Sequence, residues 1–166
     1  MDSGCLRVSS RMAQPILNMT LNRVSYTLDS TLESVNHAEE TALKFAMKSG
    51  FSEEDVQRIS MAVREGVVNA VLHGNKYDPN KKVRVSFENS GDLIEIHITD
   101  EGPGLNVEKL PDPLAPENLL KQSGRGIFLI RAFMDEVRFR KLNPGTEITL
   151  IKRLQSTELD RQEAST

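Results

Sequence analysis

The chain is poor in cysteine, in aromatic residues and in long apolar runs. Cys5 is the single cysteine among 166 residues, tryptophan is missing, and aromatic residues make up 5%. One cysteine excludes an intrachain disulfide framework and favours a reducing compartment, so we expect a cytoplasmic protein. No apolar run reaches the length of a membrane span, and the N-terminal residues lack the apolar core of a signal peptide. No membrane partner is therefore expected.

Basic residues do not exceed acidic ones. The formal net charge is −3 at pH 7, with 21 Lys and Arg against 24 Asp and Glu. Because a chain without a basic field has little to attract a phosphate backbone, we expect no direct nucleic-acid binding. One local cluster is more typical of a solvated strand face than of a nucleic-acid site. It consists of Arg138, Arg140, Lys141, Lys152 and Arg153.

The chain has the length of one domain, which would bury about two-thirds of its extended surface around a single core. Residues 21–154 are expected to form that domain, between polar, weakly patterned tails at 1–20 and 155–166. Asp29-Ser30 and Ser52 are the expected N-caps of the first two helices. Apolar periodicity and turn residues predict strands at 23–28, 82–88, 93–99, 137–142 and around 148–151, and helices at 31–49, 52–73 and after 126.

The helix predicted at 52–73 carries a polar stripe. Glu65, Asn69 and His73 are spaced four residues apart, which places their side chains on one helical face. Most other positions of this helix are apolar, so the stripe is expected to face a cavity rather than bulk water. Taken alone, Glu65 and Asn69 are better explained as a solvated carboxylate and a surface amide. In a cavity, the same groups suit a charged ligand.

Two glycine-containing motifs follow. Asp100-Glu101-Gly102-Pro103-Gly104 comes directly after a predicted strand, where a carboxylate can bind the amino group of a base and glycine lets the backbone approach a ligand. An ordinary turn explains this motif equally well. Ser123-Gly124-Arg125-Gly126 opens a predicted helix, whose first N–H groups and dipole favour an anion such as phosphate. Glycine before a helix is common, so this motif is weak on its own.

The stretch between these two motifs is long for a loop in a compact domain. It contains Pro111, Pro113 and Pro116, which prevent one regular element, and such loops are often lids over a ligand. The chain has no Walker-type Gly-x-x-x-x-Gly-Lys-[Ser/Thr] sequence and no dinucleotide fingerprint. The two commoner nucleotide-binding folds are therefore not supported.

The order of these motifs resembles the GHKL superfamily of ATP-binding domains. Residues 65–75, 100–105 and 123–126 look like its N, G1 and G2 boxes, and within the superfamily the sequence most resembles the bacterial anti-sigma-factor serine/threonine kinases. The resemblance covers about residues 23–153. It implies a two-layer α/β sandwich (α+β), with a mixed, mainly antiparallel sheet and helices packed on one face.

The resemblance also implies a role for each motif residue. Asn69 would offer its carboxamide oxygen to Mg²⁺, and Glu65 would be the general base that accepts the proton of an incoming hydroxyl. Asp100 would bind the adenine amino group of ATP, with Thr146 in support. Gly102 and Gly104 would line the pocket of the adenine base, and Gly124 and Gly126 would present their backbone N–H groups to the phosphates.

Four residues near these motifs have open roles. His73 either contacts a phosphate or a partner, or interacts favourably with the dipole of a helix C-terminus. Arg125 lies between the phosphate-loop glycines, where it either stabilises the charge of the γ-phosphate during transfer or points outward. Asn75 and Lys76 are further candidates for the phosphate region.

The activity implied by the resemblance is that of a protein kinase which uses Mg²⁺-ATP to phosphorylate an anti-sigma-factor antagonist. Only a short, unpatterned stretch precedes the first strand, so the helical module that carries a phosphorylatable histidine in histidine kinases is not expected. The expected partners are the antagonist, a sigma factor and a second copy in a homodimer. Two alternatives remain: a regulatory module that binds nucleotide without phosphate transfer, and a structural interaction protein that binds no nucleotide.

Overall fold

The computed structural model describes residues 22–104 and 125–155. Both expected tails lie outside these ranges apart from Gln155, and so does the expected lid. No helix in the described ranges is long and apolar enough to cross a membrane. In chain order the elements are β1 (Arg23–Asp29), α2 (Leu32–Lys48), α3 (Glu53–Val68), the π-helical turn η1 (Asn69–Gly74), β2 (Lys82–Asn89), β3 (Leu93–Thr99), α4 (Arg125–Phe133), β4 (Glu136–Lys141) and β5 (Thr146–Arg153).

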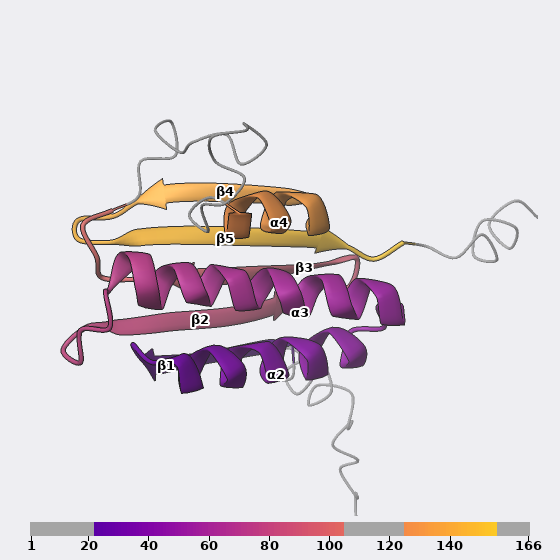
Figure 1. The fold of residues 1–166 in the computed structure, drawn as a ribbon. Coiled ribbons are helices and arrows are strands. Elements are labelled where there is room, and N and C mark those ends of the chain that lie inside the picture. The colour runs from indigo at the N-terminus through magenta and orange to yellow at the C-terminus, as the bar shows by residue number, and fades with distance from the viewer. Residues whose placement is uncertain (1–21, 105–124, 156–166) are drawn as a thin grey trace, which may run out of the picture.

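The five strands form one sheet in the order β1-β2-β3-β5-β4, and every pairing between them is antiparallel. The helices α2, α3 and α4 all pack on the same face of this sheet (Figure 1). The expected two-layer α+β architecture is therefore confirmed, and the sheet, expected to be mixed and mainly antiparallel, is antiparallel in all its described pairings. Because β5 lies beside β3, the start of β5 is next to the end of β3, where Asp100 follows.

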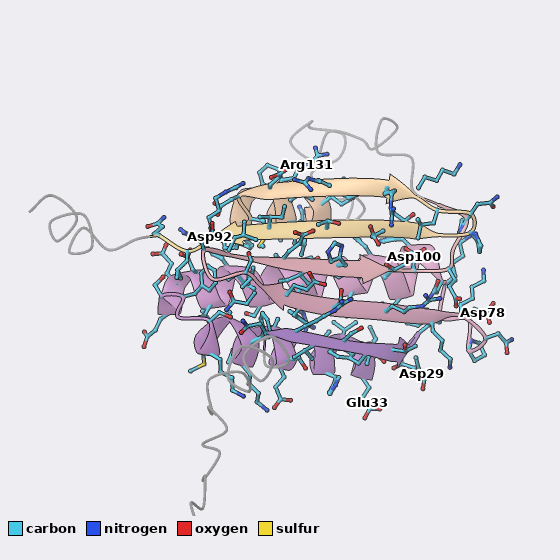
Figure 2. The ribbon with its side chains drawn as sticks, turned by 180° about the vertical axis from the view of Figure 1, so that it is seen from behind. Asp29, Glu33, Asp78, Asp92, Asp100 and Arg131 are labelled. Atoms are coloured by element: carbon cyan, nitrogen blue, oxygen red, sulfur yellow. The ribbon has the colours of Figure 1, made fainter. Side chains whose placement is uncertain are left out.

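Apolar and polar side chains alternate along the central strands, and the apolar ones form the sheet face that the helices cover. Val85 and Phe87 of β2 and Ile96 of β3 are fully buried beneath the helices, and Val63 of α3 packs into the same core. Burial of each such side chain contributes about 1.5–3 kcal/mol. The side chains between them, such as His97, belong to the other face, where polar groups are exposed in the view of Figure 2.

The first two helices begin at side-chain caps. The Ser52 hydroxyl accepts a hydrogen bond from the backbone N–H three residues later at 3.2 Å, as expected. In α2 the cap is Thr31, whose hydroxyl accepts the corresponding N–H at 3.3 Å, so the expectation of an Asp29-Ser30 cap was wrong. Ser30 is buried and donates to the Lys81 carbonyl at 2.6 Å. This hydroxyl therefore joins the start of α2 to the loop before β2.

The helix with the polar stripe changes its geometry within the stripe. It was expected to continue as one helix to about residue 73, but Asn69–Gly74 form a π-helical turn. The turn is closed by the N–H of Asn75, which donates to the carbonyl five residues earlier at 2.8 Å. A wider turn takes the following side chains out of the 3.6-residue register. Glu65 and Asn69 remain half-buried neighbours, whereas His73 is exposed, so the expected single stripe does not extend beyond Asn69.

A buried lysine joins α3 and α4 to β5. Lys152 is 6% exposed, and its ammonium group donates to the Phe133 carbonyl at 3.2 Å. The ammonium nitrogen also lies 3.5 Å from Asp55 and 3.4 Å from Asp135. The expectation that Lys152 belongs to a solvated basic face was wrong, because its side chain is directed into the helical layer. These bonds hold the last turn of α4 near the first turn of α3.

Candidate functional site

The start of α4 packs directly on the part of α3 that carries Glu65 and Asn69. A Cβ atom at Gly126 would lie 2.8 Å from Glu65 Oε2, 3.5 Å from Asn69 Nδ2 and 3.6 Å from Asn69 Oδ1. Glycine therefore lets α4 approach both side chains without displacing the carboxylate. The first N–H groups of a helix have no partner within that helix. A carboxylate, a carboxamide and the first described turn of α4 thus meet at one point.

The Asn69 carboxamide is incompletely satisfied by the described residues. Its Nδ2 atom is buried and has no hydrogen-bond partner among the described residues, which is uncommon for a buried polar atom. Such an atom fits a site that is completed by a ligand. The amide can turn either of its ends toward that ligand, and its oxygen is of the type that Mg²⁺ prefers. Together with the neighbouring Glu65 carboxylate, this group fits the phosphate end of a magnesium nucleotide.

Asp100 follows β3 and is 7% exposed. It lies at the same end of the sheet as Asp29 and Asp78 (Figure 2). Its Oδ1 atom accepts the N–H of Gly102 at 2.9 Å and the N–H of Thr146 at 3.2 Å. Burial raises the pKa of the Asp100 carboxyl above its usual value, and these two backbone hydrogen bonds oppose the rise. Both bonds end on Oδ1, so neither of them uses Oδ2.

Glycines surround Asp100 so closely that side chains are excluded. A Cβ atom at Gly74 would lie 2.5 Å from Asp100 Oδ2, and one at Gly145 would lie 2.0 Å from the Asp100 carbonyl oxygen. A Cβ at Gly102 would lie 2.2 Å from the Gly74 carbonyl oxygen. The end of η1, residues 100–104 after β3 (the Asp100 loop) and the turn before β5 therefore meet through their backbones. The sequence identified Gly74 only as a helix terminator, because nothing local indicates this contact.

Thr146 and Gly104 complete the surroundings of the Asp100 loop. Thr146 is buried, and besides donating to Asp100 it accepts the Asp100 N–H at 3.0 Å through its carbonyl. Gly104 has a φ of +91°, a conformation that favours glycine. A Cβ atom there would lie 3.0 Å from Lys141 Cε, so this glycine adjoins the end of β4. Thr146 therefore binds Asp100 through two hydrogen bonds, and the ligand roles of Thr146 and Gly104 stay predictions.

A cavity of about 840 Å³ opens beside the Asp100 loop. Two of its wall residues, Lys76 and Tyr77, have left-handed backbone conformations with φ of 51° and 57°. Such conformations are uncommon outside glycine and cluster at functional sites. The full lining is Gly74, Asn75, Lys76, Tyr77, Asp78, Pro79, Lys81, Glu101, Gly102, Pro103 and Pro144. Lys76 thus lines a cavity next to Glu101 and Gly102, and its expected contact with phosphate stays a prediction.

Three further residues named from the sequence have roles that the described contacts do not test. His73 is exposed near the end of η1, and Arg125 is exposed at the first position of α4. Gly124 lies outside the described residues. Their expected contacts with phosphate remain predictions.

The domain has two layers, and one of its helices carries a Glu-x-x-x-Asn pair. The start of another helix packs against this pair, and a buried aspartate follows a strand. These features together are those of an ATPase-type nucleotide-binding domain. The chain belongs to the histidine kinase-like ATPase domain family, which matches residues 28–152. The superfamily resemblance seen in the sequence is thereby confirmed.

Curated proteins are similar to the chain over most of its length. The anti-sigma F factor of Anoxybacillus flavithermus is 32% identical over 142 residues, which are 82% of this chain and 96% of that protein. The serine-protein kinase RsbW of Oceanobacillus iheyensis is 32% identical over 134 residues, 77% of this chain and 84% of that kinase. RsbW of Bacillus subtilis is 28% identical over 121 residues, 69% of this chain and 75% of that kinase.

A solved structure shares the fold. The crystal structure of the RsbU and RsbW domains of a Mycobacterium tuberculosis protein matches 81% of this chain with a TM-score of 0.61 at 22% identity. The chain spans 33% of the length of that solved chain. The likeness supports the arrangement of sheet and helices described above.

Proposed function

We propose that the chain is an ATP-dependent serine/threonine protein kinase of the cytoplasm that phosphorylates an anti-sigma-factor antagonist and thereby regulates transcription by partner switching. The similarity to two serine-protein kinases RsbW over most of the chain supports this function. The observation that carries it is the contact of Gly126 with both Glu65 and Asn69. In the proposed function that contact would join a general base, a magnesium ligand and the start of α4, which are parts that phosphoryl transfer requires.

Bound Mg²⁺-ATP would supply the phosphoryl group and the cation that offsets its charge. At the adenine end of the site, Asp100 would accept a hydrogen bond from the adenine amino group, and Thr146 would hold Asp100 in place. At the phosphate end, the Asn69 carboxamide oxygen would ligate Mg²⁺, and the first N–H groups of α4 would bind phosphate oxygens. Glu65 would accept the proton of the partner's hydroxyl, and Arg125 would stabilise the transferring charge.

Two further partners belong to the proposal. The chain would bind a sigma factor, which its likeness to the anti-sigma F factor of Anoxybacillus flavithermus supports. It would also form a homodimer. Analytical ultracentrifugation of the purified chain, alone and with a sigma factor encoded beside its gene, tests both associations.

The transfer reaction itself is tested with γ-labelled ATP, Mg²⁺ and an antagonist-like protein encoded beside the gene. We expect label on a serine or threonine of that protein, and none when Mg²⁺ is omitted. An antagonist that stays unlabelled while the chain binds both the antagonist and ADP contradicts the kinase.

That unlabelled outcome would instead support a nucleotide-responsive anti-sigma module without phosphate transfer. The relative named an anti-sigma F factor favours this second candidate. In such a module, nucleotide would only change the affinity for a partner. The presence of both Glu65 and Asn69 against Gly126 favours the kinase, because a pure binding module needs no base at this point.

Replacing Gly126 by alanine is expected to slow phosphate transfer about 10- to 100-fold without destabilising the protein. The new methyl group would lie 2.8 Å from Glu65 Oε2, and this flexible carboxylate would move away at little cost in stability. Alanine is also favoured over glycine in a helix by up to about 1 kcal/mol. A catalytic group displaced by about 1 Å can lose this much rate. Transfer rates and thermal unfolding of the variant measure the two effects.

The matched control for this variant is Ala132→Ser, a small change on the exposed face of the same helix. It should leave the transfer rate unchanged. A wild-type rate in Gly126→Ala would show that the position of Glu65 against α4 does not limit transfer.

A further inference from the structure

Asn75 is one of the few fully buried polar residues of the described chain, and it follows η1 directly. Its side chain and backbone are 1% exposed, and its N–H closes the π-helical turn. The sequence suggested that Asn75 contacts phosphate. A contact of that kind needs an accessible amide, and the structure gives this amide other partners.

The Asn75 carboxamide joins three segments that are distant in sequence. Its Nδ2 donates to Ser30 Oγ at 2.9 Å and to the Lys82 carbonyl at 3.0 Å. Its Oδ1 accepts the backbone N–H of Glu101 at 2.9 Å. Both amide hydrogens are thus used at the β1–α2 junction and the start of β2, and the oxygen is used at the loop after β3.

The third of these bonds acts on the Asp100 loop. Glu101 stands between Asp100 and Gly102, and its own carboxylate accepts the N–H of Lys82 at 2.7 Å. The loop is therefore held at the residue next to Asp100 from two sides, by the side chain of Asn75, which follows η1, and by the backbone of β2. The next N–H along the loop, that of Gly102, binds Asp100 Oδ1, so a shift of Glu101 would also disturb this bond.

We propose that Asn75 is a positioning residue for the nucleotide base, which fixes the Asp100 loop through the Glu101 N–H and does not touch phosphate. The proposal rests on the proposed function, because it assigns Asp100 to the base. It separates the two ends of the site: Asn75 governs how tightly any adenine nucleotide is held, whereas the Glu65 end governs transfer.

The test is Asn75→Ala, which leaves the Glu101 N–H without its acceptor. We expect the affinities for Mg²⁺-ADP and Mg²⁺-ATP to fall by the same factor, about tenfold, because an unmet buried donor is costly. The transfer rate at saturating ATP should stay within threefold of the wild type. A contact with phosphate would instead weaken ATP more than ADP and lower the saturated rate.

Ser30→Ala is the matched control, because it removes one arm of the same network and leaves the bond to Glu101 intact. It should lower the unfolding temperature, as Asn75→Ala does, yet keep the ADP affinity within threefold when both proteins are measured fully folded. Equal affinities for Asn75→Ala and the wild type, or equal losses in the two variants, would overturn the positioning role.

Hydrogen exchange of the wild-type chain without nucleotide gives a second readout that needs no variant. The Glu101 amide should exchange as slowly as the core amides, and fast exchange would overturn the proposal even where Asn75→Ala does not fold. Slow exchange supports it. A wild-type chain that binds no ADP overturns the proposed function and this inference together, whereas unchanged binding in Asn75→Ala overturns this inference alone.

Discussion

Replacing Glu65 by glutamine is expected to reduce phosphate transfer by about 10²- to 10⁴-fold, the usual contribution of a general base. Glutamine has nearly the same shape and helix propensity, so the contact with Gly126 is kept. It cannot accept the proton of the incoming hydroxyl at neutral pH. Affinity for Mg²⁺-ADP should stay within threefold, because base recognition by Asp100 is separate from this carboxylate. Labelled phosphate transfer and calorimetric titration with ADP measure the two quantities.

Glu53→Gln is the control for this prediction, since Glu53 lies exposed in the first turn of the same helix. Its transfer rate should equal that of the wild type. Full transfer by Glu65→Gln would show that another group takes the proton. Loss of ADP binding in the same variant would show that Glu65 has a role in holding the nucleotide.

Replacing Asp100 by asparagine is expected to weaken ADP binding about 100-fold. Asparagine can keep one oxygen on the N–H groups of Gly102 and Thr146, which now bind Oδ1. Its amide nitrogen then takes the place of Oδ2, so a donor would face the donating amino group of adenine. Loss of a charged hydrogen bond and an unmet polar contact together account for this magnitude.

The same variant should be at least as stable as the wild type when no nucleotide is present. Burial raises the pKa of Asp100 in the folded chain, so the ionised carboxylate opposes folding at neutral pH. This penalty is present above the folded-state pKa and disappears below the pKa of the unfolded chain, about 3.9. The unfolding-temperature advantage of Asp100→Asn should therefore shrink as the pH falls from 7 toward about 4.

Asp92→Asn provides a control at the opposite end of β3 (Figure 2). Asp92 is exposed in the hairpin turn, so neither ADP affinity nor the pH dependence of unfolding should change. An Asp100→Asn variant that binds ADP as tightly as the wild type would remove Asp100 from the base site. A variant less stable than the wild type at pH 7 would contradict the burial penalty.

The pairing of Glu65 with Asn69 could be predicted from sequence because it depends on local geometry alone. A four-residue spacing keeps two side chains on one face wherever the helix stays α-helical. The position of Asp100 was predictable for a similar reason, since regular alternation of isoleucines identifies β3 and its end. The order of these motifs along the chain then indicates the superfamily without the fold.

His73 and Asn75 could not be predicted in this way. The π-helical turn that exposes His73 is closed by the Asn75 N–H, and Asn75 is fixed by Ser30, Lys82 and Glu101. Ser30 and Glu101 are distant from Asn75 in the chain, so no local pattern indicates these contacts. The same holds for Lys152, which a charge pattern assigns to solvent but which reaches Asp55 on α3 and Asp135 in the turn after α4. Local periodicity therefore predicts where helices and strands lie. Hydrogen bonds and ion pairs between distant residues fix the conformation at the ends of these elements.

Calorimetric titration of the wild-type chain with Mg²⁺-ADP, in parallel with Asp100→Asn, tests most directly that these elements form a nucleotide site. The account predicts saturable binding of one nucleotide per chain, and an affinity about 100-fold lower in the variant. A folded wild-type chain that gives no heat with Mg²⁺-ADP would contradict it.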